Sequence, residues 1–252
     1  MNVVFVFIGM NKIKNAMRSA ITYPLFLLVL TFAIIVMVGI YLVPPLASVA
    51  GSDVAWTGAA SLLITVSEFS INYWHIIAAV FFGLCFLVWF SLPNWIGGIR
   101  TKFDNISPWN IYKIHISVGW LMSLSAMVAA GVSVPDAMRK LADNSNRYLR
   151  EILDSALQYI ANGDNLGVAL ANTGRNFPNN ELIGDLTIYS DMNDFSTNIS
   201  NVAKDYLQHS VKKMESLSSA LNSIGILLVS AIIAWVVLAT FQMQDQITMM
   251  LS

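Results

Sequence analysis

The sequence contains a single cysteine, Cys85, so disulfide bonds within one chain and cysteine metal clusters are excluded. Charged residues are scarce as well, at 12% of the 252 residues, whereas 56% of the residues are hydrophobic. An ordinary soluble domain has about 25% charged residues. This composition predicts an integral membrane protein. A formal net charge of −1 gives no reason to expect nucleic acid as a partner.

The sequence also lacks the motifs of common enzyme sites. It has no glycine-rich phosphate loop ending in Lys-Ser or Lys-Thr, and Gly97-Gly98 is an isolated pair. The three histidines are far apart in sequence and have no partners at metal-ligand spacing. We therefore expect no catalytic residue, no cofactor and no bound metal. Four carboxylates lie close together in sequence: Glu181, Asp185, Asp191 and Asp194. We interpret them as a solvated acidic face, and a cation site is the less expected alternative.

Three long runs carry no charge at all: Leu25 to Val43, Ile76 to Leu92 and Ile224 to Phe241. At about 1.5 Å per residue, a run of this length covers the roughly 30 Å core of a bilayer. Each run therefore predicts a transmembrane helix. Trp109 to Gly131 is also mostly apolar, but Lys113 interrupts it, and we expect a buried helix of a soluble bundle there.

Prolines are expected to bound the first span. Pro24 suits a first helical turn, where its missing N–H has no intrahelical partner, and Pro44-Pro45 should end the helix. The apolar run from Val3 to Ile8 is too short to cross a bilayer. We expect it to be a separate stub or a segment at the membrane surface.

All fourteen Lys and Arg lie before the first apolar run or between the second and third. Cytoplasmic segments of membrane proteins are enriched in Lys and Arg, so these two regions are predicted to be cytoplasmic. The expected order is a cytoplasmic stub (1–19), transmembrane helix 1 (20–45), an external loop (46–75), transmembrane helix 2 (76–97), a cytoplasmic helical bundle (98–217), transmembrane helix 3 (218–243) and an external tail (244–252).

The cytoplasmic region repeats apolar residues at the i, i+3, i+4, i+7 spacing of amphipathic helices. The repeats begin at Val134, Leu149 and Ile199, with Ser133 as a cap for the first and Asn162-Gly163 as a stop for the second. No stretch alternates convincingly with period two. The sequence predicts an all-α fold with an antiparallel bundle of about six helices. Its last helix should start near Asp194 and continue unbroken into the third apolar run.

A basic cluster lies at the turn between two of the expected helices and consists of Arg139, Lys140, Arg147 and Arg150. It is the candidate partner-binding site of the chain. A solvated helix face, or attraction to anionic lipid headgroups, are the alternatives.

Several motifs, taken together, resemble the GspF-like family of inner-membrane platform proteins from type IV pilus and type II secretion machines. They are Lys14 to Ala20 leading into Tyr23-Pro24, Pro44, Leu121 to Val134 with Ala137-Met138, Gly163 to Leu166 with Ala169-Leu170, and Phe177-Pro178. The resemblance covers the three spans and the second of the family's two cytoplasmic bundles. It departs from the family at residues 190–194, where a glycine-containing turn is common.

The resemblance implies a multi-pass protein of the bacterial inner membrane, with its external segments in the periplasm. It implies a non-enzymatic scaffold that couples a hexameric assembly ATPase to pilin or pseudopilin subunits, in contact with other inner-membrane assembly proteins and membrane lipid, and as a homo-oligomer. The basic cluster would then contact the ATPase or its adaptor. A membrane receptor or signalling adaptor remains an alternative. A transporter subunit is less expected, because the three runs lack ionisable groups.

Overall fold

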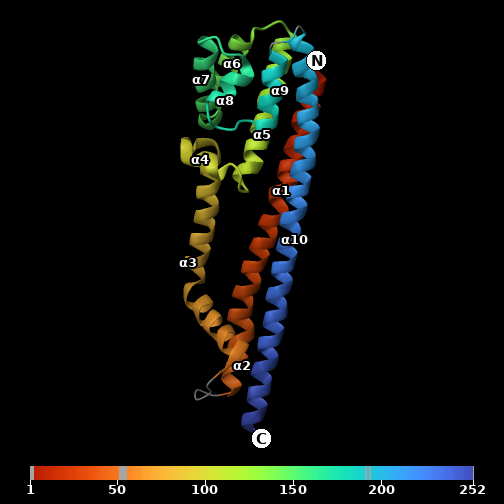
Figure 1. Ribbon diagram of the computed structural model, residues 1–252. Coiled ribbons are helices and arrows are strands. Elements are labelled where there is room, and N and C mark those ends of the chain that lie inside the picture. Colours follow the sequence, from red (N-terminus) through yellow and green to blue (C-terminus); the bar gives the residue numbers. More distant parts are fainter. Residues whose placement is uncertain (1–2, 51–55, 191, 193, 252) are drawn as a thin grey trace. The chain divides into compact units, whose positions relative to one another are not determined.

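The computed structural model describes residues 3–50, 56–190, 192 and 194–251, and within these residues every regular element is a helix. The expectation of an all-α fold is confirmed (Figure 1). The elements are α1 (Val3–Met37), the π-helix η1 (Val38–Leu42), α2 (Val43–Ala50), α3 (Gly58–Asn94), α4 (Gly98–Phe103), α5 (Trp109–Ala129), α6 (Val134–Asp143), α7 (Arg147–Ala161), α8 (Leu166–Asn172), α9 (Asn180–Ser190) and α10 (Phe195–Leu251).

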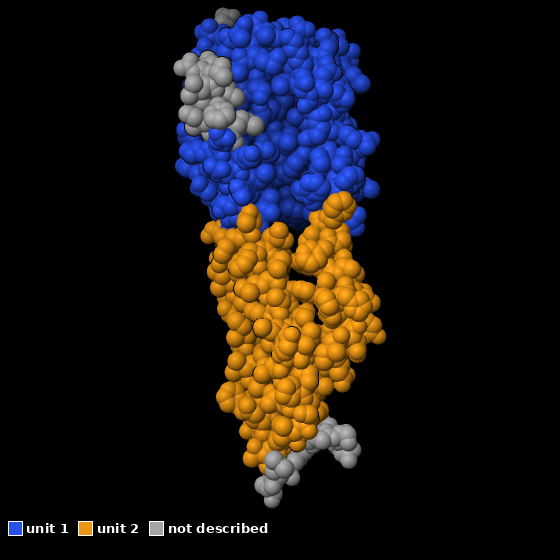
Figure 2. Space-filling model, turned by 180° about the vertical axis from the view of Figure 1, so that it is seen from behind, with its two compact units in different colours: residues 1–21, 87–218 blue, residues 22–86, 219–252 orange. Residues whose placement is uncertain are grey.

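The chain divides into two compact units, coloured separately in Figure 2. Unit 1 consists of residues 1–21 and 87–218, and unit 2 consists of residues 22–86 and 219–252. Helices α4 to α9 belong wholly to unit 1. Three helices, α1, α3 and α10, contribute residues to both units.

Polar caps set the starts of the short helices in unit 1. The Ser133 hydroxyl accepts a hydrogen bond from the backbone N–H of Asp136 at the start of α6, at 3.3 Å. Asn146 caps α7 and Asn165 caps α8 in the same way. Each cap satisfies a backbone donor that has no partner inside its helix, which stabilises the helix by about 1 kcal/mol. The predicted cap and the predicted stop at Asn162 are both confirmed.

The core of unit 1 forms around α5. Leu121, Leu124, Leu153 and Leu170 are fully buried, and the edge of the Trp120 ring meets Phe177 at a centroid distance of 5.5 Å. These side chains come from α5, α7, α8 and the segment after α8. Burying one such side chain contributes about 1.5–3 kcal/mol. The apolar spacing of the sequence therefore buries one face of these helices in a shared core.

Unit 2 has a small core where α2, α3 and α10 meet. Val43, Leu63 and Met243 are buried in it, and the Gln242 side chain accepts a hydrogen bond from the N–H of Ala59 at 2.8 Å. This bond satisfies a free donor in the first turn of α3. The end of α10 therefore holds the start of α3 by apolar contact and by a cap.

Large apolar side chains are exposed along the helices of unit 2. Phe26 on α1, Phe86 on α3 and Leu227 on α10 are 59%, 60% and 69% exposed. Exposed apolar side chains in such number are stable when lipid or another protein covers them. This exposure fits the prediction that these helices lie in a membrane.

Among the described residues, four helices are long and apolar enough to cross a bilayer: Asn11–Val49, Gly58–Asn94, Trp109–Ala129 and Phe195–Met249. The third is α5, and 56% of its most apolar window is buried within the protein, against 22%, 0% and 11% for the others. We therefore describe α5 as a core helix of unit 1. The number of spans stays a prediction.

Two predictions about the prolines that bound the first span are wrong. Pro24 lies inside α1, which begins at Val3 and includes the short apolar run expected to be separate. Pro44-Pro45 do not end the helical path but lie in the first turn of α2, directly after the wide π-turn η1. The π-turn shifts the hydrogen-bond pattern just before the two residues that cannot donate, so the path continues as a new helix. Helix α3 begins at Gly58, within the expected loop; residues 51–55 lie outside the described residues.

The turn before α10 departs from the family pattern at residues 190–194, of which 191 and 193 lie outside the described residues. Asp194 has a backbone φ of 72°. This is the left-handed region that glycine occupies without strain and that aspartate tolerates better than most residues. The predicted start of the last helix near Asp194 is confirmed, and α10 continues unbroken to Leu251.

Candidate functional site

The four residues of the basic cluster lie on two consecutive helices of unit 1. Arg139 and Lys140 are on α6, Arg147 and Arg150 are on α7, and all four are exposed. The four residues therefore lie on either side of the turn between α6 and α7, as the sequence predicts. Whether they bind a partner stays a prediction.

Two members of the cluster already make intramolecular contacts. The Arg150 guanidinium donates from Nε to the Ala142 carbonyl at 3.0 Å and from Nη2 to the Asp143 carbonyl at 2.6 Å. Arg150 thus satisfies the last carbonyls of α6, where a positive charge is also favoured by the helix dipole. Arg139 forms an exposed ion pair with Asp136 at 3.4 Å.

Lys140 and Arg147 have no carboxylate within 4 Å among the described residues. Their charges are therefore available to a partner, whereas Arg150 has a structural role of its own. The structure thus separates the cluster into two kinds of residue, and the sequence had treated all four as equivalent.

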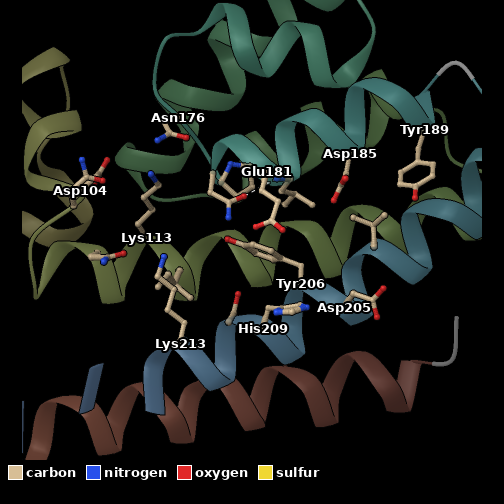
Figure 3. Close-up of a pocket in the computed structure, with 18 residues that line it drawn as sticks. Asp104, Lys113, Asn176, Glu181, Asp185, Tyr189, Asp205, Tyr206, His209 and Lys213 are labelled. Atoms are coloured by element: carbon tan, nitrogen blue, oxygen red, sulfur yellow. Dashed lines mark hydrogen bonds between the residues drawn. The ribbon is translucent and has the colours of Figure 1, made fainter. Parts of the chain in front are cut away.

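Unit 1 also contains a polar pocket of about 560 Å³ (Figure 3). Its walls come from α5, α9 and α10, with further residues from the segments that follow α4 and α8. Lys113 and Lys213 lie at one end, and three carboxylates, Glu181, Asp185 and Asp205, extend from there along the pocket (Figure 3). The two lysines therefore share one end of the pocket with Asp104, and the rest of the pocket is acidic.

Lys113 is a buried cation on α5, with 6% of its side chain exposed. Burial lowers the pKa of Lys113 below its ordinary value, the nearby charge of Lys213 lowers it further, and Asp104 acts in the opposite direction. Among the described residues, no carboxylate lies within ion-pair distance of its amine. Burying an ammonium group without a direct counter-charge costs folding free energy.

Asp104 lines the same pocket, but its charge is held by another group. Arg100 and Asp104 form an ion pair, 1% and 4% exposed, and the Tyr148 hydroxyl donates to Asp104 Oδ2 at 3.0 Å. The Arg100 guanidinium also lies 4.7 Å from the centroid of the Tyr148 ring. Burial raises the pKa of Asp104, although Arg100 and Tyr148 favour the charged form. This network anchors α4 to α7.

The alternative of a cation site gains no geometric support. Among the described residues, no group of three or more His, Cys, Asp or Glu side chains is arranged to hold a metal ion. Glu181 and Asp185 line the pocket, whereas Asp194 does not. Asp191 lies outside the described residues.

Sequence reasoning missed the pocket. It used Lys113 as an interruption of an apolar helix and counted both Lys113 and Lys213 among the basic residues that predict topology, but it did not bring the two together. A lone lysine in an otherwise apolar helix does indicate a buried charge, but its partners come from α9 and α10, which are distant in sequence. Only the packing of those helices brings the groups together.

A comparison with known protein families matches the region of the chain that contains most of the helices of unit 1. The family described as type II secretion system protein F matches residues 120–242, just under half of the chain. No curated protein and no solved structure matches the chain. The matched region starts within α5 and includes α6 to α9 and most of α10. The resemblance to GspF-like platform proteins is thereby confirmed, and the chain carries, over these residues, a domain of the type II secretion system protein F family.

Proposed function

We propose that this protein is a non-enzymatic inner-membrane platform that couples a cytoplasmic hexameric ATPase to pilin or pseudopilin subunits. The observation that carries the proposal is α10. This one helix supplies Ile199 and Ala203 to the core of unit 1, and then exposes Leu227 and Leu238 in unit 2. The family match includes both stretches. A platform needs such a connection, because force from the ATPase has to reach subunits in the membrane.

We further propose three spans, with the helical bundle of residues 98–217 in the cytoplasm and the C-terminal tail in the periplasm. The fourteen Lys and Arg residues support this orientation, since the residues 46–75 and the tail contain none. Burial of more than half of the apolar window of α5 supports leaving that helix out of the membrane. Other inner-membrane assembly proteins, membrane lipid and a second copy of the chain are further partners in this proposal, and nucleic acid is not.

Lys140 and Arg147 are the residues that we assign to the contact with the ATPase. They are exposed, and among the described residues neither is paired with a carboxylate. Charged groups at the rim of an interface set the association rate and the choice of partner. An acidic surface on the ATPase or its adaptor is the chemistry that would complement them.

Site-specific crosslinking in cells tests the proposal. A photo-crosslinking amino acid is placed at Lys140 or Arg147 in unit 1, and at Leu227 or Leu238 in unit 2. Cells that assemble pili should yield the ATPase or its adaptor from the first pair of positions and pilin from the second. Glu215, exposed on α10 and outside the basic cluster, serves as a control position. Recovery of neither partner would contradict the platform role.

A further inference from the structure

We propose that the pocket of unit 1 is a binding site for a small oxyanion, a phosphate or a phosphate monoester, held between Lys113 and Lys213. Nothing in the platform role requires this site. The proposal rests on the geometry and the unmet polar groups of the pocket.

The first observation is the unpaired state of Lys113. The side chain is 94% buried, given its 6% exposure, and it lines the pocket without a carboxylate at ion-pair distance among the described residues. The nearest anionic network, at Asp104, is directed to Arg100 and Tyr148. A buried ammonium group in this state is stabilised when an anion enters the pocket.

The second observation is the neighbouring lysine. Lys213 of α10 lines the same end of the pocket, close enough for the two positive charges to disfavour each other. Figure 3 shows both side chains at this end, with Asn176 beside Lys113. Two lysines that repel each other both gain when a single oxyanion lies between them, because lysine binds phosphate as a point charge.

The third observation concerns a hydrogen-bond acceptor. Asn176 lines the pocket, and its Oδ1 is buried with no hydrogen-bond partner among the described residues. An unmet buried acceptor destabilises the fold. A ligand that carries an O–H group, as hydrogen phosphate or the alcohol part of a phosphate monoester does, can donate to it.

The carboxylates along the rest of the pocket determine how a ligand is oriented in it. Glu181, Asp185 and Asp205 repel a second negative charge, so the oxyanion is confined to the lysine end. The volume of about 560 Å³ lies within the range of small-molecule sites, about 300–1,000 Å³. A compact ligand with one anionic group, and with any cationic or donor group directed to the carboxylates, is the best fit.

The test is direct binding to the purified full chain in an uncharged detergent. Inorganic phosphate and glycerol 3-phosphate are titrated by calorimetry at constant ionic strength, with chloride as the reference anion. Lys113→Met and Lys213→Met should each weaken binding about 10- to 100-fold, the range for hydrogen bonds to charged groups. Lys113→Arg should retain part of the affinity, because it keeps the charge.

Lys212→Met is the matched control. Lys212 and Lys213 are adjacent and both exposed on α10, but Lys213 lines the pocket and Lys212 does not. The control variant should bind phosphate like the unmodified chain. If Lys113→Met failed to fold, Lys213→Met would still decide the question, since that side chain is on the surface.

A second arm identifies the source of the oxyanion. The chain is reconstituted into phosphatidylcholine vesicles with or without phosphatidylglycerol, and protection of Lys113 and Lys213 from an amine-reactive reagent is measured. Protection by soluble phosphate supports a free ligand, and protection by phosphatidylglycerol alone supports a lipid headgroup. Chloride is the reference anion here as well. The proposal would be overturned if neither phosphate nor phosphatidylglycerol protected the two lysines, or if chloride protected them equally.

Discussion

At the scale of single residues, buried charges divide into those with a partner and those without one. Arg100 is 1% exposed and has an ion pair with Asp104 and a ring contact with Tyr148. Lys113 has comparable burial and no such partner among the described residues. In the first arrangement, loss of either charged partner is strongly destabilising, because the other would be left buried and uncompensated. In the second arrangement, the contribution of Lys113 to the free energy of unfolding depends on pH and on whether an anion binds in the pocket.

Lys113 makes stability depend on pH in the alkaline range. Its pKa in the folded chain lies below 10.5, its ordinary value, because burial outweighs the opposing effect of Asp104, and Lys213 lowers the pKa further. Between the two values the unfolded chain binds more protons than the folded chain, so the free energy of unfolding rises as the pH increases towards 10.5. Lys113→Met should remove this part of the rise. Denaturant unfolding of the detergent-solubilised chain across this range checks it.

The exposed neighbour Lys212 provides the comparison for this measurement. No charge of Lys212 contributes to the shift at Lys113, so Lys212→Met should keep the same pH dependence as the unmodified chain. An unchanged pH profile in Lys113→Met would show that Lys113 titrates in the folded chain as it does in the unfolded chain.

At the scale of the elements, close contact between α8 and α9 depends on one glycine. A Cβ atom added to Gly167 would lie 2.1 Å from the backbone nitrogen of Thr187. A backbone atom in a helix cannot yield as a flexible side chain does, so the two helices would have to separate. Gly167 is therefore the residue that permits this packing, although it lies inside a helix where glycine is otherwise unfavourable.

Gly167→Ala should lower the free energy of unfolding by about 3 kcal/mol or more, because of this clash with backbone. Gly184→Ala is the matched substitution: Gly184 lies in α9, is exposed, and has no atom within 4 Å of an added Cβ. It should stabilise the chain by about 0.5–1 kcal/mol, the helix preference of alanine over glycine. Thermal unfolding of both variants in detergent measures the difference. Equal stability of the two would contradict the close contact.

At the scale of the whole molecule, three helices carry residues of both units, and the family match extends over one of them. In our proposal, unit 1 receives the ATPase and unit 2 the pilin. The basic cluster would then act on assembly without acting on insertion into the membrane. We leave Arg150 out of the proposed binding residues, because its guanidinium already holds the C-terminal end of α6.

Reversing the charge of the two available members, Lys140→Glu with Arg147→Glu, should reduce recovery of the ATPase with the platform at least about 10-fold, by like-charge repulsion at the interface. The amount of protein in the membrane should not change. The control reverses Lys102 and Lys212, which are exposed in unit 1 and lie outside the cluster. Co-purification and pilus counts measure the result, and normal assembly in the first variant would remove the cluster from the interface.

The sequence by itself determined the fold class, the apolar segments and the helices of the bundle. These features depend on neighbours within a few residues: the Ser133 cap, the spacing from Leu149 to Ile160, and the absence of a breaker after Asp194. Local hydrogen bonding and apolar periodicity can be read from one stretch of chain. The family resemblance followed from the same motifs.

Only the tertiary structure decided where the prolines act and which charges meet. Pro44-Pro45 continue the helical path because a π-turn precedes them, and no local pattern indicates that turn. The role of Arg150 depends on the way in which α7 packs on α6. Lys113, Asn176 and Lys213 line one pocket although they are far apart in sequence. Such groups are brought together when the apolar faces of the helices are buried against one another. This burial fixes the distances between helices, but no local sequence pattern indicates which polar groups will meet.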